Sequence, residues 1–456
     1  MPDDARYLAV SILNAITENP HLTLDNAIDT HESSLGLLSR KDRAFFNALV
    51  FGVIRWRNHL DHIIRFLSTT PVKKINPMVL NVLRICIFQL KFMDRVPPSA
   101  AVNTSVELVK KALNPAWIVK FTNGLLRNAV RKLNDIPFPE YKNNPALYLS
   151  VHQSFPEWMI KRWIARYGIE QTLSLCVAMN DIPPLTLRVN ALKINRNELL
   201  DMLNQQGFDA CETIYSPVGI TLKGSHDSVT RLPGFEEGLF QVQDEAAQLV
   251  TLFLNPQPIE KVLDACAGLG GKTAHMAELM DGRGMILATD LDEQKLVKLK
   301  HEANRLGIQM IDTACEDMSQ ECHLKDHMIF DRVLVDAPCS GLGVIRRNPD
   351  IKWHHHKKNL ERYRKRQVCL LENAASLVRP GGIVVFAVCS TEPEENEQVV
   401  RAFLEKNPSF ILDNDLEGIH KPILSLVTDD GYLQTGPQSS GMDGFFAARL
   451  KKQSIE

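Results

Sequence analysis

The second half of the chain alternates short β-branched runs with helical patterns, and this alternation restricts the possible folds most strongly. The runs are KVLDACA, MILATD, DRVLVDAP and GGIVVFAVCS, with FFAARL near the end of the chain. Strands separated by helical patterns predict parallel pairing in a doubly wound α/β sheet. In such sheets, ligands bind beyond the carboxyl ends of the strands. We therefore expect an α/β domain over 236–456 whose site lies where these runs end.

The first part of the chain has a different pattern. Residues 1–140 repeat apolar residues at helical spacing, as in AFFNALVFGVIRW and PMVLNVLRICIFQLKFM, and strand signals are scarce. A compact helical bundle is expected there. The polar, Pro-rich stretch IPFPEYKNNP is typical of a linker. Residues 141–235 then combine TLRVNAL, NRNELLDMLNQQG and GITLKG, which predicts a small α+β module.

Composition excludes several classes of protein. No run approaches the ~20 apolar residues of a membrane helix, and the acidic start MPDD is unlike a secretory signal, so we expect a cytoplasmic protein. The nine cysteines show no C-x-x-C spacing, which disfavours a zinc ribbon and favours free thiols. No strong dimerisation signal is present, so a monomer is expected.

The net charge of −2 does not indicate a nucleic-acid binder, but the distribution of charge is uneven. Residues 71–132 hold eleven Lys or Arg and two acidic residues, and residues 346–366 hold nine against two. Such segments suit contacts with phosphates, although each alone fits a solvated helix face equally well.

A glycine-rich loop follows the first run. In VLDACAGLGGKT, at 262–273, an apolar run breaks into a loop with three glycines and then into a helical pattern. Glycines allow tight turns and close approach to a ligand. The next run ends in Asp290, where dinucleotide-binding folds hold ribose hydroxyls. The loop suits a dinucleotide, a nucleotide or S-adenosylmethionine, or is a turn without a ligand. A P-loop is disfavoured, because its first glycine would fall on Cys266.

Two cysteines follow later runs. Asp336 and Cys339 lie just after one run, and Cys389 ends the next, directly before the acidic turn EPEEN. A lone cysteine after an apolar run is usually a small buried residue. Two of them at the ends of consecutive strands are expected to face the same cleft.

Such a pair suits methylation of carbon 5 of cytosine, which is a weak nucleophile. Addition of a thiolate to carbon 6 produces an enamine-like ring that can attack a methyl sulfonium, after which the carbon 5 proton and the thiol leave. We predict Cys389 as the nucleophile and Asp336 as the carboxyl group that stabilises the developing charge. The thiolate needs electropositive surroundings, which residues 346–366 are expected to supply.

These motifs carry a family resemblance. D-x-C-A…G-G-K-T, D-A-P-C-S, G-V-I-R-R-x-P-D-I-K-W, C-S…P-E-E-N and D-G-F-F-x-A-x-L resemble RNA cytosine-5 methyltransferases of the NOL1/NOP2/Sun family. FGVIR, VPPSAAVNTSVELVK and NGLLRNAVRKL resemble the NusB-like RNA-binding domain that is fused to bacterial small-subunit rRNA enzymes of the RsmB (Fmu) type. The resemblance covers essentially the whole chain. It implies an all-α NusB-like bundle (1–140), a small α+β linker or RNA-binding module (141–235) and a Rossmann-like class I methyltransferase domain (236–456).

The resemblance also implies site residues. Cys389 becomes the nucleophile, Cys339 the cysteine of product release, and Asp336 a group between cofactor and base. S-adenosylmethionine would be held by Asp290 at the ribose, by Asp317 or Glu316 near the adenine, and on its methionine side by Cys266, Ala267, Gly268, Leu269, Gly270, Gly271 and Lys272. Phosphates beside the target base would be contacted by Arg346, Arg347 and Lys352, which otherwise are surface charges.

The sequence departs from the family at three points. Gly268-Leu269 replaces the usual Ala-Pro, Val388 replaces the usual Thr before the nucleophile, and Cys315 stands where Gly is frequent. The consecutive residues His354, His355 and His356 cannot all face one ion on a regular element, so no metal is expected.

We expect small-subunit (16S) rRNA, naked or partly assembled, as partner. One rival is the same chemistry on tRNA or another rRNA site. The other is an RNA-binding assembly or antitermination factor with a silent domain, which would have no reason to keep both cysteines with Asp336.

Overall fold

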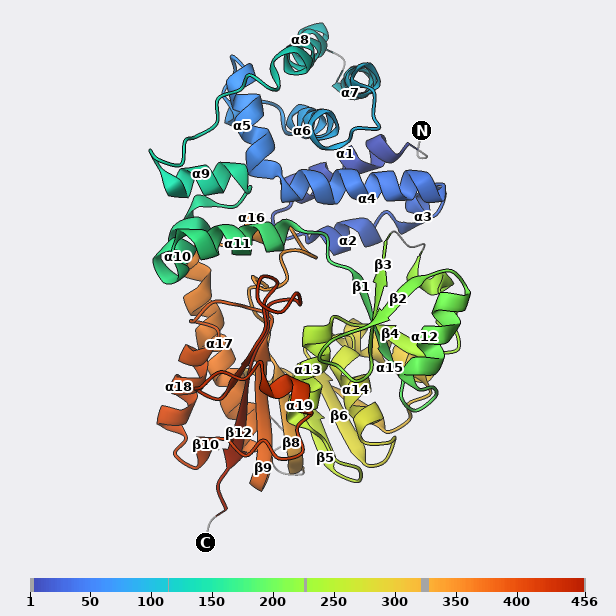
Figure 1. The fold of residues 1–456 in the computed structure, drawn as a ribbon, viewed down its shortest axis with the longest axis vertical. Coiled ribbons are helices and arrows are strands. Elements are labelled where there is room, and N and C mark those ends of the chain that lie inside the picture. The colour runs from blue at the N-terminus through green and yellow to red at the C-terminus, as the bar shows by residue number, and fades with distance from the viewer. Residues whose placement is uncertain (1–3, 114, 225–227, 321–327, 455–456) are drawn as a thin grey trace. The chain divides into compact units, whose positions relative to one another are not determined.

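Every strand of the described residues lies after residue 184, and the elements before it are helical (Figure 1). The computed structural model describes residues 4–113, 115–224, 228–320 and 328–454. The chain divides into two units, one comprising Met1–Asp181 with Ile345–His355 and the other Ile182–Val344 with His356–Glu456. No helix of the described residues is long and apolar enough to cross a membrane.

The N-terminal unit is a helical bundle, as predicted from the apolar periodicity. Its first helices are α1 (Ala5–Glu18), α2 (Leu24–Asp29), α3 (Glu32–Leu35), α4 (Arg40–Arg55), α5 (Arg57–Leu67), η1 (Val72–Lys74), α6 (Pro77–Phe92), α7 (Pro98–Leu113) and α8 (Ala116–Lys132). They are followed by α9 (Pro145–His152), α10 (Glu157–Tyr167) and α11 (Ile169–Asn180). The segment Ile345–His355, called the inserted segment below, adds α16 (Ile351–His354).

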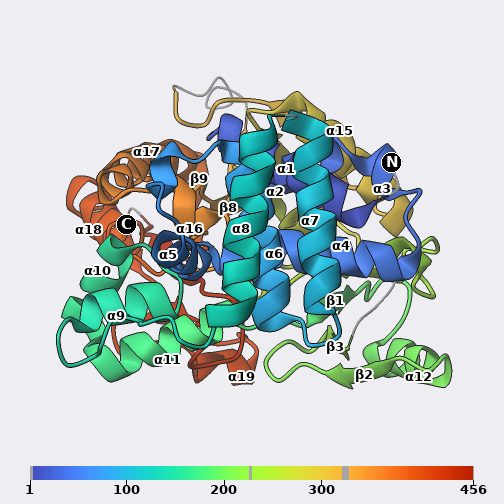
Figure 2. The same ribbon diagram turned by 90° about the horizontal axis from the view of Figure 1, so that it is seen from above.

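Helix α6 forms the centre of this bundle. It lies between the layer of α7 and α8 and the layer of α1 and α4 (Figures 1 and 2), which explains why it is apolar nearly all round. Asn76 caps its first turn by accepting from the amides of Met78 and Val79. Gly52 of α4 allows a close approach, because a Cβ there would lie 2.1 Å from Cζ of Phe88.

Two segments that follow residue 140 pack with the N-terminal helices. Helices α9–α11 belong to the N-terminal unit, and α9 packs against α5. Asn58 of α5 donates to the carbonyl and the hydroxyl of Ser150, at 2.9 and 3.0 Å. Residues 345–355 also belong to this unit, although they are surrounded in sequence by the α/β domain.

The second unit begins with a small antiparallel sheet, which confirms the predicted α+β module. Its strands have the order β2-β3-β1-β4. The elements are β1 (Leu185–Val189), α12 (Arg196–Gln205), β2 (Asp209–Glu212), β3 (Gly219–Lys223), η2 (Val229–Arg231) and β4 (Phe240–Val242). Asn195 starts α12 with a capping box, exchanging hydrogen bonds with Glu198.

The large sheet confirms the predicted Rossmann-like domain. Its order is β10-β12-β9-β8-β5-β6-β7, with β11 paired to β12. The strands are β5 (Lys261–Asp264), β6 (Met285–Asp290), β7 (Ile311–Cys315), β8 (Phe330–Asp336), β9 (Val378–Val388), β10 (Phe410–Leu412), β11 (Tyr432–Gln434) and β12 (Phe446–Lys452). The neighbours from β7 to β9 are parallel, whereas β12 runs antiparallel to β9.

Helices cover both faces of this sheet. They are α13 (Glu245–Leu254), α14 (Gly271–Leu279), α15 (Glu293–Leu306), α17 (Lys357–Ser376), α18 (Glu397–Lys406) and α19 (Lys421–Leu424). The side chains of β9 alternate between the two faces of the sheet. Val384, Phe386 and Val388 join the core under α17 and α18. Val385 and Ala387 join the core under α13 and α14.

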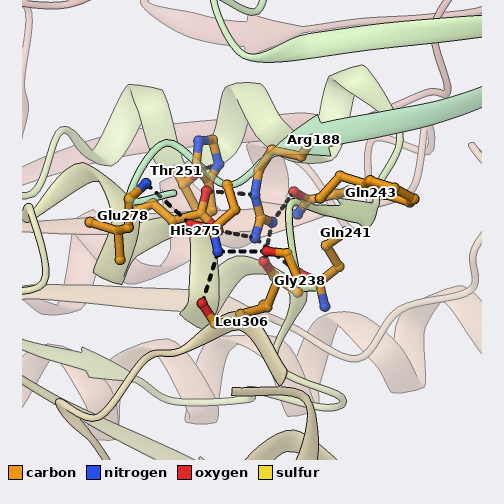
Figure 3. Close-up of polar contacts among 12 residues, drawn as sticks. Arg188, Gly238, Gln241, Gln243, Thr251, His275, Glu278 and Leu306 are labelled. Carbon is orange, nitrogen blue, oxygen red and sulfur yellow. Dashed lines mark hydrogen bonds and ion pairs between the residues drawn. The ribbon is translucent and has the colours of Figure 1, made fainter. Parts of the chain in front are cut away.

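A buried arginine joins the small sheet to the large domain (Figure 3). Arg188 of β1 is 0% exposed and pairs with Glu278 of α14, with Nη2 at 2.8 Å from Oε1 and Nε at 3.1 Å from Oε2. Its remaining donors reach Gln241 Oε1, Gln243 Oε1 and the carbonyl of Gly271, at the start of α14. The small sheet is therefore attached at the helix that follows the glycine-rich loop.

Replacement of this arginine should destabilise the second unit. Arg188→Met would leave Glu278 buried without its partner, and we expect a loss of roughly 3–5 kcal/mol in the free energy of unfolding. Urea titration followed by circular dichroism measures it. Arg283→Met, which removes an exposed pair with Asp281, should change stability by less than about 1 kcal/mol. Equal effects of the two substitutions would contradict the assignment.

Candidate functional site

The carboxyl ends of β5, β6, β7 and β8 border one pocket. Its volume is about 250 Å³. It is lined by Ala265, Cys266, Asp290, Leu291, Asp292, Lys295, Glu316, Asp317, Met318, Pro338, Arg366 and Leu370. The predicted residues Cys266, Asp290, Asp317 and Glu316 are thus brought together. Lys295 and Arg366 were not predicted as lining residues, since each looks like an ordinary charge on a helix.

The glycine-rich loop turns sharply between β5 and α14. Gly268 and Gly270 adopt positive φ angles of 57° and 83°, which favour glycine. A Cβ on Gly270 would lie 2.4 Å from Cγ of Leu299, so the loop packs directly on α15. Helix α14 then begins at Gly271 without a side-chain cap. Its first amides therefore remain available for a polar ligand.

Asp290 connects this loop to β6. Its Oδ2 accepts from the amide of Gly268 at 2.9 Å, and its Oδ1 accepts from the amide of Asp292 at 2.9 Å. Lys295 lies 4.0 Å from the same carboxylate. The carboxylate is therefore fixed at the edge of the pocket, where it also has room for hydroxyl groups of a ligand.

Asp317 and Glu316 follow β7, and both line the pocket. Asp317 Oδ1 accepts from the hydroxyl and the amide of Ser319, at 2.6 and 3.0 Å, and these hydrogen bonds hold the pKa of its carboxyl below the usual range. The amide of Glu316 donates to the carbonyl of Asp290 at 3.2 Å. Asp317 is the better anchored carboxylate of the two.

An ion pair stands beside the pocket. Lys272 Nζ lies 2.6 Å from Asp336 Oδ2, at the end of β8, and 5.2 Å from the ring centroid of Phe445. Burial disfavours the charged form of Lys272, but the charge and the hydrogen bond of Asp336 outweigh burial and raise the lysine pKa. The pair therefore places one fixed cation and one carboxylate at the site.

The two predicted cysteines meet at the same edge. Cys339 Sγ and Cys389 Sγ are 3.1 Å apart, although 50 residues separate them in sequence. The amide of Gly343 donates to the carbonyl of Cys389 at 3.0 Å, which ties the loop after β8 to the end of β9. A Cβ on Gly343 would lie 1.9 Å from the carbonyl oxygen of Gly444, so this position requires glycine.

The three basic residues predicted to contact RNA belong to the N-terminal unit. Lys352 is 0% exposed and donates to the carbonyls of Arg55 and Ser154 and to Oδ1 of Asn180, at 3.3, 3.2 and 2.7 Å. Its predicted phosphate contact is wrong for this structure, because its ammonium group is enclosed by protein. Arg346 is buried and its carbonyl accepts from Arg55 Nη2 at 2.7 Å. Only Arg347 of the three is half-exposed.

Lys352 instead stabilises the inserted segment. It lies 3.6 Å from the ring centroid of Phe155, and burial lowers its pKa well below the usual value. Trp353 Nε1 donates to the carbonyl of Ile54 at 2.9 Å, and Asp350 accepts from the amide of Leu24 at 3.1 Å. Residues 345–355 are therefore part of the core of the bundle rather than a free basic surface.

The Rossmann-like sheet thus carries a glycine-rich loop, a carboxylate-lined pocket and a thiol pair at its strand ends, and family models identify the class of protein as a methyltransferase. The model described as 16S rRNA methyltransferase RsmB/F matches residues 251–451, the NusB family matches 3–131, and the RsmF/B-like ferredoxin-like domain matches 155–228.

Relatives match over the full length. The probable ribosomal RNA small subunit methyltransferase B of Bacillus subtilis (strain 168) is 34% identical, with 98% of each chain covered. The ribosomal RNA small subunit methyltransferase B of Pseudomonas syringae pv. tomato is 34% identical over 98% of this chain and 96% of its own length. The crystal structure of PH0851 is 25% identical, with a TM-score of 0.81 over 98% of this chain and 99% of that one. The chain belongs to the RsmB/F family of ribosomal RNA methyltransferases.

The buried carboxyl group of Asp264 gives the site a pH-dependent stability. Burial raises its pKa from 3.8 to about 7, although Thr273 donates to it at 2.7 Å. The pKa of Asp264 is higher in the folded than in the unfolded protein. The protonated carboxyl group therefore stabilises the fold fully below about pH 4, and this stabilisation is lost as pH rises through about 7.

We therefore expect Asp264→Asn to gain stability relative to wild type as pH rises from about 4 to about 7, and no further above that. Urea titrations at several pH values measure the difference. Asp201→Asn, on the exposed face of α12, serves as the control and should show no such trend. A difference that is independent of pH would contradict the raised pKa.

Proposed function

We propose that this protein transfers a methyl group from S-adenosylmethionine to carbon 5 of a specific cytosine in small-subunit rRNA, with Cys389 as the nucleophile. The observation that carries the proposal is the thiol pair, with 3.1 Å between the two sulfur atoms. Methyl transfer to oxygen or to an exocyclic nitrogen has no need of a second thiol. Methylation of carbon 5 needs a thiolate to add to the ring, and a second thiol in contact with the first suits assistance in its release.

The residues of the pocket fit S-adenosylmethionine. The positive φ angles of Gly268 and Gly270 and the uncapped start of α14 leave backbone amides for the carboxylate of its methionine part. Asp290 suits the ribose hydroxyls, and Asp317 or Glu316, with Met318 and Leu370 nearby, suits the adenine. When bound, this group supplies an electrophilic methyl sulfonium.

The chain's own residues account for the remaining chemistry. Cys389 adds as a thiolate to carbon 6 of the cytosine, which makes carbon 5 nucleophilic. Asp336 accepts a hydrogen bond or shares a proton at nitrogen 3 and the exocyclic amine, where charge develops. Lys272 holds this carboxylate at 2.6 Å and supplies the positive charge that a thiolate needs nearby. Cys339 lies close enough to exchange a proton as the base is released.

The relatives' names support small-subunit rRNA as the substrate. The match of residues 3–131 to the NusB family is consistent with an additional RNA-binding module. The cytosine must leave its stack to reach the thiol, as in other enzymes that modify bases. Methylation of tRNA or of another rRNA site, and a non-catalytic assembly role, are the competing outcomes of the experiments below.

Removal of the nucleophile should abolish methylation. We expect Cys389→Ala to reduce transfer of labelled methyl groups to small-subunit rRNA by more than about 10³-fold, since the addition step has no substitute group. Cys369→Ala, which removes an exposed thiol of α17, is the matched control and should retain full activity. A fully active Cys389→Ala protein would exclude the assigned nucleophile, and wild-type protein inactive on every RNA would exclude the enzyme.

Removal of the second thiol should trap an intermediate. We expect Cys339→Ala to accumulate a covalent complex with rRNA through Cys389, because addition still occurs while release is impaired. Denaturing gels separate this complex from free RNA, and the double variant Cys339→Ala/Cys389→Ala should not form it. Rapid turnover without a complex would show that Cys339 has no part in release. Bisulfite sequencing of the product identifies the cytosine.

A further inference from the structure

The acidic turn after Cys389 contains a buried carboxylate that contacts both cysteine loops. Glu395 is 0% exposed. Its Oε1 accepts from the amide of Ser340 at 2.8 Å and from Gln367 Nε2 at 3.1 Å. Its Oε2 accepts from the hydroxyl of Ser390 at 2.7 Å and from the hydroxyl of Ser340. One side chain therefore receives four hydrogen bonds, two on each oxygen.

The positions of these donors relate the carboxylate to the thiols. Ser340 directly follows Cys339, and Ser390 directly follows Cys389. The two serine hydroxyls are themselves 3.3 Å apart. Gln367 of α17 also donates to the carbonyl of Pro338 at 3.0 Å. Cys339 is thus held on both sides, and Cys389 on one side, by a single cluster that is centred on the carboxylate.

Glu395 also affects the ionisation of Cys339. The pKa of Cys339 lies well above its usual value, because of its hydrogen bond with Cys389, its burial, and the negative charges of Cys389 and Glu395. Burial and the nearby carboxylate of Glu395 therefore both disfavour the thiolate form of Cys339.

We propose that Glu395 is a positioning residue: its four hydrogen bonds hold the loops of Cys339 and Cys389 so that the two thiols stay in contact while Cys389 acts as the nucleophile. This inference rests on the proposed function. It predicts two separable effects, because the carboxylate supplies both hydrogen-bond acceptors and charge. Glu395→Ala removes both, whereas Glu395→Gln removes the charge and can still accept from Ser340 and Gln367.

The first experiment tests positioning on the protein alone. Diamide oxidises two neighbouring thiols to a disulfide, and the two electrons and two protons that they lose reduce diamide to a hydrazine. Peptide mapping gives the rate of Cys339–Cys389 bridging. We expect Glu395→Ala to slow it by about tenfold or more, since held reactants react faster than mobile ones. Glu405→Gln, an exposed position of α18, should leave the rate unchanged.

The second experiment tests the charge during the reaction. With unmodified small-subunit rRNA, the covalent complex is allowed to form in a single turnover, and the rate at which it releases methylated RNA is measured against pH. We expect Glu395→Gln to move the alkaline limb of this release profile to lower pH, because Cys339 then loses its proton more easily and no longer assists release. The shift should vanish in the Cys339→Ala background, whereas a merely structural defect would persist there.

The outcomes separate the two proposals. A bridging rate unchanged in both Glu395→Ala and Ser390→Ala overturns the positioning role, whether or not the protein methylates RNA. Ser390→Ala removes one donor and retains the carboxylate, so it provides this test if Glu395→Ala does not fold. If Glu395→Gln still shifts the pH profile in the Cys339→Ala background, the charge of Glu395 does not act through Cys339, and this part of the inference is overturned. Normal bridging together with no RNA complex in wild type counts against the proposed function alone.

Discussion

The parallel pairing of β8 with β5 on one side and β9 on the other determines where every reactive group of the site lies. Asp264 pairs in register with Leu334, and Asp336 pairs with Ala387, so three strands end at nearly the same level. The glycine-rich loop, the Cys339 loop and Cys389 all follow directly from those ends. A slip of one residue would turn each strand's core residues to the opposite face. The two apolar cores therefore also fix the register of the edge where the two cysteines and Asp336 lie.

Crossover connections supply the remaining parts of the site. Helix α17 lies between β8 and β9 in sequence, and it brings Arg366 to the pocket and Gln367 to Glu395. Adjacent residues on one helix thus contact the carboxylate-lined pocket and the cysteine loops. Helix α14 similarly links the glycine-rich loop at its start to the ion pair of Arg188 and Glu278. Positions of this kind follow from packing, and they give no local signal in a sequence.

The sequence predicts those features of the fold and the site that depend on residues close together in the chain. The alternation of runs and helical patterns predicted the sheet, and its strand ends correctly placed Cys339 and Cys389 at one edge. The contact between the thiols depends on two loops that only tertiary structure brings together. Lys352 was misassigned for a related reason, because a lysine in a basic segment is usually solvated. Its burial depends on the distant carbonyls of Arg55 and Ser154.

The departures from the family pattern agree with the local geometry. Val388 is 0% exposed and lies on the face of β9 under α17 and α18, so a hydroxyl there would point into an apolar core. Valine in place of the usual threonine at position 388 therefore removes no polar group from the edge where Cys389 lies. In the glycine-rich loop, Gly268 adopts a positive φ, and no atom of the described residues lies within 4 Å of an added Cβ. Leu269 is 57% exposed. The loop thus replaces the rigidity of a proline with a glycine turn whose amide is held by Asp290.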